Sequence, residues 1–251
     1  MREEVVTTRL AAEAGVTHRS DPPSRGLWKD RTLVVRRLGL TGYRGALELQ
    51  AALVERRRSG EIPDTLLLLE HPHVITLGSS GDRSHLLLSP DELAARGIEV
   101  HRAGRGGDVT YHGPGQLVGY PILDLKPDRR DLHAYLRSLE AVVIGVLRTF
   151  GIQGERDKSA TGVWARGAKA AAIGIRVSSG WITSHGFAVN ANTDLSYFDA
   201  IVPCGLHGRT VTSLTRLLQR EITPATVAPA VVAAMVAEFG YGSVRDTPAD
   251  C

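Results

Sequence analysis

One long amphipathic segment, from about Arg129 to Phe150, constrains the fold more than any other feature and predicts a helix. Its apolar residues recur at three- and four-residue spacing, so they share one face. They are Leu132, Tyr135, Leu136, Leu139, Val142, Val143, Val146, Leu147 and Phe150. Gly151 follows directly and favours helix termination. A helix with one apolar face has to bury it, so the fold needs a second packed layer here.

Short apolar runs elsewhere predict buried strands. We expect strands at 32–38, 65–70, 73–77, 171–177 and 182–190, and helices at 43–58, 211–220 and 226–238. Ser89, Pro90 and Glu92 form a capping signal that opens one more short helix. Helices and strands mixed without strict alternation predict an α/β (α+β) fold in one domain.

Composition limits the class of protein. Apolar residues make up 43% of the 251 residues and charged residues 23%, as in ordinary globular domains. No run reaches 18 apolar residues and no secretory signal opens the chain, so we expect a cytoplasmic protein that binds no membrane. A net charge of +3 is too small to favour nucleic acid. Residues 1–26 hold few large apolar side chains, so we expect a disordered extension before a domain at 27–251.

Glycine is concentrated between Arg102 and Gln116, with five glycines in residues 104–115. Glycine weakens a packed strand but suits backbone that turns sharply or lies against a ligand. The segment is therefore either a ligand-binding surface or a long hairpin loop. It lacks the third glycine of a dinucleotide fingerprint. Gly162–Lys169 has glycines at phosphate-loop spacing, but no Ser or Thr follows the lysine, so neither segment predicts a nucleotide site.

Two single residues are candidates for chemistry. Lys169 precedes a small, apolar run, where a buried ammonium is costly unless it is paired, although its head could also lie in water at a strand mouth. Cys204 lies between Pro203 and Gly205, on a constrained turn that could present a thiol, or it is simply a small buried apolar residue. Cys251 is the last residue, so a disulfide or a cysteine-based metal site is not expected.

Taken in order, these segments resemble the lipoyl(octanoyl) transferase family. The matching motifs are R-G-G-x-x-T-Y-H-G-P-G-Q from Arg105, K-x-A-A-I-G from Lys169, H-G-F-A-x-N from His185 and P-C-G from Pro203. The resemblance runs from about residue 65 to 215 and includes Glu70-His71-Pro72. It implies the fold of biotin and lipoate protein ligases, a mixed sheet flanked by helices.

The resemblance also implies roles for particular residues. Cys204 matches the acyl-accepting nucleophile, and Lys169 matches the lysine that lowers the pKa of that thiol. The residues that match segments lining the acyl site are Arg105, Gly106, Gly107, Asp108, Val109, Thr110, Tyr111, His112, Ala172, Ile173, Gly174, Gly186, Phe187 and Ala188. Ala170 departs from the larger aliphatic residue usual in the family, and the loop at 178–184 varies among relatives.

The implied reaction moves an octanoyl group from acyl carrier protein to Cys204 and then to a lysine. The implied acceptors are lipoyl domains of 2-oxo acid dehydrogenases and the H protein of glycine cleavage. Because a thioester is already activated, no ATP and no cofactor are expected. A thiol with a pKa of about 8.5 needs a neighbouring cation to be mostly ionised at neutral pH.

Two other functions compete with this interpretation. ATP-dependent ligases of the same fold typically carry Asp after the histidine and Asn after the later glycine, where this chain has Gly113 and Gln116. A metal-binding protein could use the nine histidines, but only His71 and His73 lie close together in sequence, without a paired-ligand spacing. No metal is therefore expected.

Overall fold

A seven-stranded mixed sheet forms the centre of the computed structural model, which describes residues 31–157, 160–202 and 210–247. Its strands are β1 (Thr32–Leu40), β2 (Asp64–Glu70), β6 (Gln116–Ile122), β7 (Val163–Ala165), β8 (Ala168–Val177), β9 (Thr183–Asn190) and β10 (Ser243–Thr247). Their order is β10-β1-β2-β6-β9-β8-β7. β1 runs parallel to β2 and β10, whereas the other neighbours are antiparallel. The extension expected at 1–26 lies outside the described residues, so that boundary stays a prediction.

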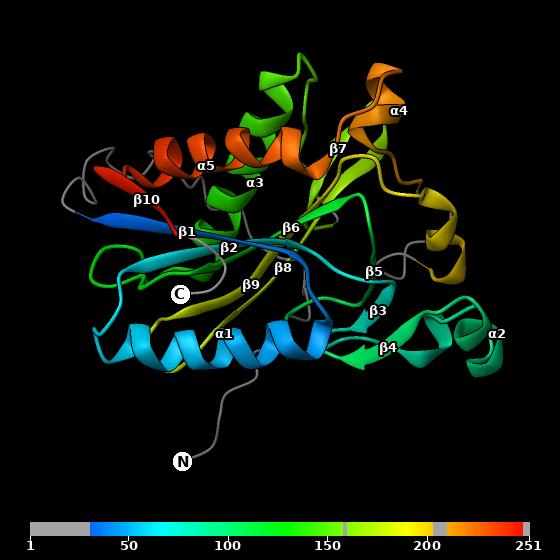
Figure 1. Cartoon of the computed structure of the whole chain (residues 1–251), viewed down its shortest axis with the longest axis horizontal. Coiled ribbons are helices and arrows are strands. Elements are labelled where there is room, and N and C mark those ends of the chain that lie inside the picture. Colours follow the sequence, from blue (N-terminus) through cyan, green and yellow to red (C-terminus); the bar gives the residue numbers. More distant parts are fainter. Residues whose placement is uncertain (1–30, 158–159, 203–209, 248–251) are drawn as a thin grey trace, which may run out of the picture.

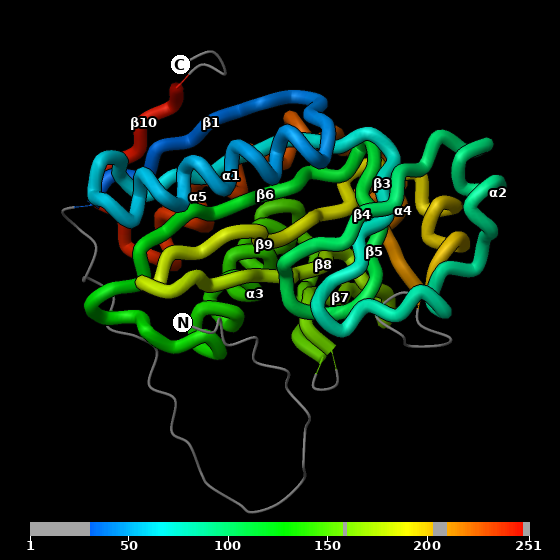
Figure 2. The backbone as a smooth tube through the Cα atoms, turned by 90° about the horizontal axis from the view of Figure 1, so that it is seen from below, coloured from blue at the N-terminus to red at the C-terminus, as the bar shows by residue number. Residues whose placement is uncertain are grey.

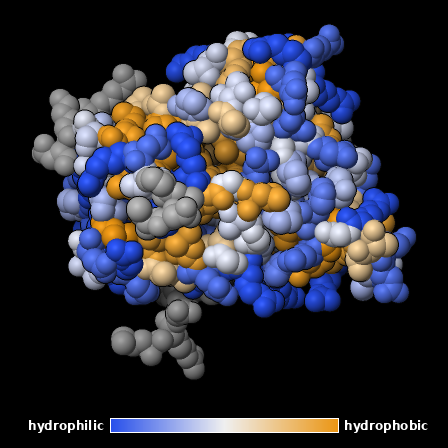
Figure 3. Space-filling model, in the orientation of Figure 1, coloured by the Kyte–Doolittle hydropathy of each residue, from blue (hydrophilic) through white to orange (hydrophobic). Residues whose placement is uncertain are grey.

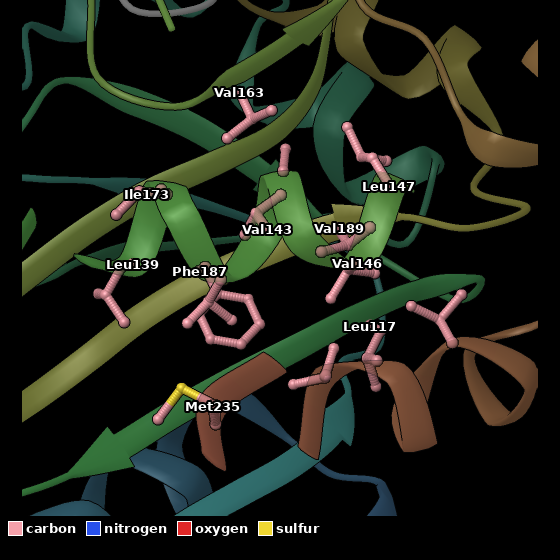
Figure 4. Packing of buried hydrophobic residues seen from close by; sticks show 14 of the residues in the cluster. Leu117, Leu139, Val143, Val146, Leu147, Val163, Ile173, Phe187, Val189 and Met235 are labelled. Atoms are coloured by element: carbon pink, nitrogen blue, oxygen red, sulfur yellow. The ribbon is translucent and has the colours of Figure 1, made fainter. Parts of the chain in front are cut away.

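Helices cover both faces of this sheet (Figure 1). α1 (Tyr43–Arg58) lies on one face, and α3 (Leu132–Thr149) and α5 (Pro224–Phe239) lie on the other. We call these the α1 face and the α3–α5 face. The larger apolar core lies between the sheet and α3 and α5, where Phe187 and Val189 of β9 meet Val143 of α3 and Met235 of α5 (Figure 4).

A second, three-stranded sheet lies at one end of the first (Figures 1 and 2). Its strands are β3 (Val74–Leu77), β4 (Glu99–Arg102) and β5 (Val109–His112), in the order β4-β3-β5. The short helices beside it are η1 (Arg83–His85), α2 (Pro90–Ala95) and η2 (Leu195–Ala200). The glycine-rich segment therefore contains a strand, and β5 pairs with β3 instead of β6. The hairpin-loop alternative is wrong.

Several element boundaries differ from those expected, and local hydrogen bonds explain the shifts. α3 begins at Leu132 because the Asp131 side chain accepts a hydrogen bond from Ala134 N at 3.0 Å. α4 (Leu214–Leu218) begins later than residue 211 because Ser213 caps it. The capping signal at α2 is confirmed: Ser89 and Glu92 hydrogen-bond reciprocally at 3.3 and 2.8 Å.

The surface seen in Figure 3 is mostly hydrophilic, with apolar side chains gathered in patches that include the outer side of α5. The sequence of α5 is rich in Ala and Val on every side, so its outer turns stay apolar where they meet water. Across the described ranges, no helix is both long enough and apolar enough to span a bilayer.

Candidate active site

Lys169 lies at the start of β8, where a β-bulge sets the direction of its side chain. Lys169 pairs with Trp164 and Ala171 with Val163, so Ala170 has no partner on β7. An extra residue of this kind re-aims the side chains beyond it. Ala170 and Ala171 both join the α3–α5 core, and Lys169 leaves the bulge on the opposite face. The ammonium of Lys169 is therefore kept out of the apolar core, although the residue is only 9% exposed.

The backbone of residues 210–212 lies directly beside Lys169. Lys169 N donates to Thr210 O at 2.9 Å, and Thr212 N donates to Lys169 O at 2.9 Å. These two bonds occupy the side of β8 that β9 leaves open, because β9 ends at Asn190 and its pairing with β8 begins at Ala171. The segment that follows residue 209 is thus fixed to the strand that carries the lysine.

Residue 202 has a fixed position as well. Val202 N donates to His85 O at 2.9 Å, and His85 Nδ1 lies 2.6 Å from a carboxylate oxygen of Asp108. Val202 is thus bonded to His85, which also contacts Asp108, and Thr210 is bonded to Lys169; residues 203–209 between them are not described. Cys204 belongs to these residues and, like Cys251, lies outside the described part of the chain.

A chain of hydrogen bonds joins His112 to the same backbone. His112 Nδ1 donates to Gln116 Oε1 at 2.7 Å, and Gln116 Nε2 donates to Asn190 Oδ1 at 2.9 Å. Asn190 Nδ2 then donates to Thr212 O at 2.9 Å, next to the bond between Thr212 and Lys169. All the donors and acceptors are consistent with His112 protonated at Nδ1 only. These bonds fix the ends of β5, β6 and β9 relative to the backbone beside β8.

His112 and two other buried histidines, His71 and His185, lie on the α1 face. His71 donates from Nδ1 to Thr41 O at 2.6 Å and accepts at Nε2 from the Tyr120 hydroxyl at 2.8 Å. Burial lowers the pKa of His71 to about 4. Burial also lowers the pKa values of His112 and His185 to about 3, and the Arg105 charge contributes to both shifts. All three imidazoles are neutral at neutral pH.

His185 reaches this face through an unusual backbone conformation. It has a φ of +56°, a left-handed value that side chains rarely adopt within a strand. Its backbone N–H donates to Gln50 Oε1 of α1 at 2.8 Å, and its ring meets Tyr120 edge-on. Alternation along β9 would otherwise place His185 on the side of Phe187, in the apolar core. Strain of this kind is common at functional sites.

The glycine-rich loop lies across β8 on the same side. Gly106 N donates to Ile175 O at 2.9 Å. A side chain at Gly174 would place its Cβ 2.9 Å from Arg105 Cδ and 3.1 Å from Gly106 O. Gly174 in turn pairs with Gly186 of β9. The three predicted segments therefore meet here, and glycine is required for them to approach so closely.

The predicted site residues do not all point the same way. Ala172, Gly174, Gly186 and Ala188 lie on the α1 face, and the first two are half-buried. Ile173 and Phe187 alternate with them and lie in the α3–α5 core (Figure 4). Val109 and Tyr111 are buried in a separate apolar cluster around the small sheet. The side chains of these four residues support the site from behind.

The histidines that suggested a metal site are bound to protein groups instead. His71 is engaged at both nitrogens, and His73 Nδ1 lies 2.8 Å from the Tyr111 hydroxyl while its ring stacks on Tyr197. Within the described ranges, no three His, Cys, Asp or Glu side chains gather closely enough to hold a metal ion.

Sequence reasoning missed several residues of this site. Gln50 and Tyr120 bind the histidines from α1 and β6, and Trp164 lies beside Lys169. Gln50 stands on an apolar helix face and Tyr120 in an apolar strand, and a polar group inside such a pattern is the one signal that could have drawn attention to them.

Comparison with known proteins gives a consistent result. The family model described as the lipoyl protein ligase A/B catalytic domain matches residues 42–236. A Rubrobacter xylanophilus protein named octanoyltransferase is 58% identical over 202 residues, which cover 80% of this chain and 90% of the relative. An octanoyltransferase of Chloroflexus aggregans is 50% identical over 217 residues, covering 86% and 98%.

Solved structures with the same arrangement are more distant in sequence. A crystal structure of lipoate-protein ligase A bound with ATP matches with a TM-score of 0.68 and 18% identity, over 87% of this chain and 88% of that one. A putative lipoate protein ligase from Thermoplasma acidophilum with bound lipoic acid gives a TM-score of 0.64 at 18% identity, over 87% and 88%. At this identity the likeness concerns the fold alone, and it confirms the predicted mixed sheet flanked by helices.

Proposed function

Because the chain belongs to the lipoyl protein ligase A/B catalytic-domain family, we propose that it transfers an octanoyl group to a lysine of lipoyl domains, through a thioester on Cys204. The resemblance drawn from the sequence motifs is confirmed by the family model. The octanoyltransferase names of relatives at 49–58% identity support the acyl group and the transferase class. The observation that carries the mechanism is the position of Lys169, buried and fixed to residues 210 and 212 just beyond Cys204.

In the first step, the Cys204 thiolate attacks the carbonyl carbon of octanoyl-acyl carrier protein. A carbon–sulfur bond to Cys204 forms, and the bond to the carrier sulfur breaks. The Lys169 ammonium favours the attacking thiolate and gives its proton to the departing thiolate. One thioester replaces another, so the step is nearly balanced in free energy.

In the second step, the amine of the target lysine attacks the acyl-Cys204 carbonyl. Lys169, now neutral, takes a proton from the attacking nitrogen as the carbon–nitrogen bond forms. Cys204 leaves as a thiolate, so the ammonium–thiolate pair is restored. An amide replaces a thioester, which makes the step favourable without ATP.

The α1 face of β8 and β9 offers a surface for the octanoyl chain. Ala172 and Gly174 are half-buried there, next to the 105–107 loop, and present no side chain larger than a methyl group. The 105–107 loop lies closely over Gly174, so we place the alkyl chain beside Ala172, whose methyl group leaves more room than a longer side chain would. We assign the acyl-binding role to this face and a supporting role to Ile173 and Phe187.

The two positions that separate this chain from the ATP-dependent ligases have structural roles here. A Cβ at Gly113 would collide with the Tyr111 hydroxyl, so an aspartate cannot be placed there without moving Tyr111. Gln116 spans the distance between His112 and Asn190, and the shorter asparagine would reach only one of them. These contacts support the transferase over the ligase.

The surface near the site suits an acidic protein partner. A pocket of about 320 Å³ opens beside Thr210 and Thr212 and is bordered by the exposed Arg166 and Arg216. Paired cations near a site entrance attract an acidic protein and speed its encounter. We propose acyl carrier protein as the donor, lipoyl domains of 2-oxo acid dehydrogenases and the glycine cleavage H protein as acceptors, and the cytoplasm as the location.

The energy source tests the proposal. Octanoyl-acyl carrier protein and an apo lipoyl domain should give an octanoylated domain with no nucleotide present, as measured by mass spectrometry of the domain. Free octanoate with ATP and magnesium should give little product. The matched control is the Cys204→Ser variant, which should be inactive in the first reaction. Acylation that requires ATP and persists in this variant would identify a ligase instead.

A further inference from the structure

The side chain of Lys169 lies in a narrow space between Gly162 and Trp164. Its Nζ lies 5.1 Å from the centroid of the Trp164 ring, over the ring face. Trp164 is itself 5% exposed and is the cross-strand partner of Lys169. A cation over the face of tryptophan, the best of the aromatic rings for this interaction, is attracted by the ring quadrupole, more strongly where water is excluded.

Gly162 gives the lysine stem the space to reach that ring. It has a φ of +139°, and a Cβ there would lie 2.7 Å from Lys169 Cε and 2.6 Å from Ala171 O. A side chain at residue 162 would therefore crowd both the lysine stem and the backbone of β8. The glycine that resembled part of a phosphate loop in the sequence instead makes room for a lysine.

The bulge completes this arrangement. If residues 169–171 alternated regularly, with no bulge at Ala170, Lys169 would share the core side of β8 with Ala171, away from Trp164. Two features of the backbone and one ring thus determine the position of one ammonium. Such precision is needed if the charge has to stay beside a thiol and not turn towards water, as a flexible lysine stem otherwise allows.

We propose that Trp164 is a positioning residue of the acyl transfer, whose ring face holds the Lys169 ammonium where it favours the thiolate of Cys204. This inference rests on the proposed function, because it requires the ammonium–thiolate pair. Trp164 touches no reacting atom in this account and acts only through Lys169.

The test measures the alkylation rate of Cys204 with iodoacetamide at neutral pH, in full-length protein carrying Cys251→Ser so that Cys204 is the only thiol. Trp164→Leu should slow alkylation about three- to tenfold, the factor expected for one lost cation–π contact. Trp164→Phe keeps a weaker ring and should fall between Trp164→Leu and the parent. Gly162→Ala should resemble Trp164→Leu, since it displaces the lysine.

Two controls separate positioning from general damage. Trp181→Leu removes a half-buried tryptophan at the opposite end of β8 and should leave alkylation unchanged. In a Lys169→Ala background, Trp164→Leu should slow alkylation no further, because the group that it positions is gone.

The pattern of rates also separates this inference from the proposed function. If Lys169→Ala slows alkylation but Trp164→Leu does not, the positioning role is wrong and the ion pair stands. An additive effect of Trp164→Leu in the Lys169→Ala background would likewise overturn the positioning role. If Lys169→Ala itself has no effect, the ammonium–thiolate pair is wrong and the inference fails with it.

Discussion

The two faces of the central sheet differ in the kinds of side chain that they bury. The α3–α5 face buries large aliphatic and aromatic side chains, among them Leu117, Phe187 and Val189, in one continuous apolar cluster. The α1 face, at the end near the small sheet, combines glycine and alanine with neutral histidines and the guanidinium of Arg105. The first face buries mostly apolar side chains, whereas the second gathers polar side chains, several of which hydrogen-bond to one another or to the backbone.

Irregular backbone in β8 and β9 decides which side chains of these strands lie on each face. Regular alternation along β8 and β9 would send Lys169 and His185 into the apolar core. The bulge at Ala170 and the left-handed backbone of His185 turn both side chains to the other side. The two irregularities therefore separate the chemistry from the core, at the cost of local strain.

The largest expected effect comes from removing the Lys169 ammonium from the α1 face. Lys169→Ala should lower octanoyl transfer by at least about 100-fold, in the range of lost acid–base catalysis, and change the free energy of unfolding little. Leu117→Ala, on the α3–α5 face, should do the reverse: it should destabilise the fold by about 2–5 kcal/mol and leave transfer per folded molecule nearly unchanged. Transfer rates and chemical denaturation of both variants make the measurement.

The same two variants can also show that the two faces do not differ in function. Equal losses of transfer and stability in both would show that the two faces are not functionally distinct. Lys169→Arg is the matched variant for the charge. It should retain part of the thiol reactivity but not full transfer, because arginine keeps its cation and cannot give up a proton.

A smaller effect should appear in the pH dependence of stability. The pKa of His185 is lowered to about 3 in the folded state, against about 6.5 in an unfolded chain. The unfolded state therefore binds more protons below pH 6.5, so the stability that this histidine contributes is complete above pH 6.5 and is lost as the pH falls towards 3. The loss should be at most about 1.4 kcal/mol per pH unit for each such histidine.

His185→Asn tests this expectation, because asparagine is neutral and tolerates a positive φ. Urea denaturation between pH 7 and 5 should show a smaller loss of stability on acidification than in the wild-type protein. His133→Asn, at an exposed position of α3, is the control and should not alter the slope. If both variants keep the wild-type slope, His185 does not contribute to the acid sensitivity.

Much of the fold could be predicted because the signals were local. The helix at 43–58 matches α1 residue for residue, and the capping signal at Ser89 fixes the start of α2. β10 was missed because Ser243–Thr247 is short and almost wholly exposed, so it carries no apolar pattern and forms only by pairing with β1. α3 starts later than expected because Asp131 caps it, and Arg129, which precedes the cap, lies with its guanidinium over the ring of Phe239.

The geometry of the site was harder to predict from the sequence than the fold. The motifs around Lys169 and His185 could be recognised, but the direction of both side chains depends on a bulge and a left-handed residue that no period reveals. The bond between Gln116 and Asn190 joins residues 74 positions apart and follows only from the pairing of β6 with β9. Long-range pairing decides such contacts, and a single sequence does not specify it.

The most direct test of the account looks for the acyl group on the enzyme. Protein carrying Cys251→Ser is incubated with octanoyl-acyl carrier protein and no acceptor, and its intact mass and peptide masses are measured. We predict one octanoyl group, located on Cys204, that disappears when apo lipoyl domain is added and reappears on the lysine of that domain. A domain that becomes octanoylated while Cys204 never carries the acyl group would contradict the covalent mechanism.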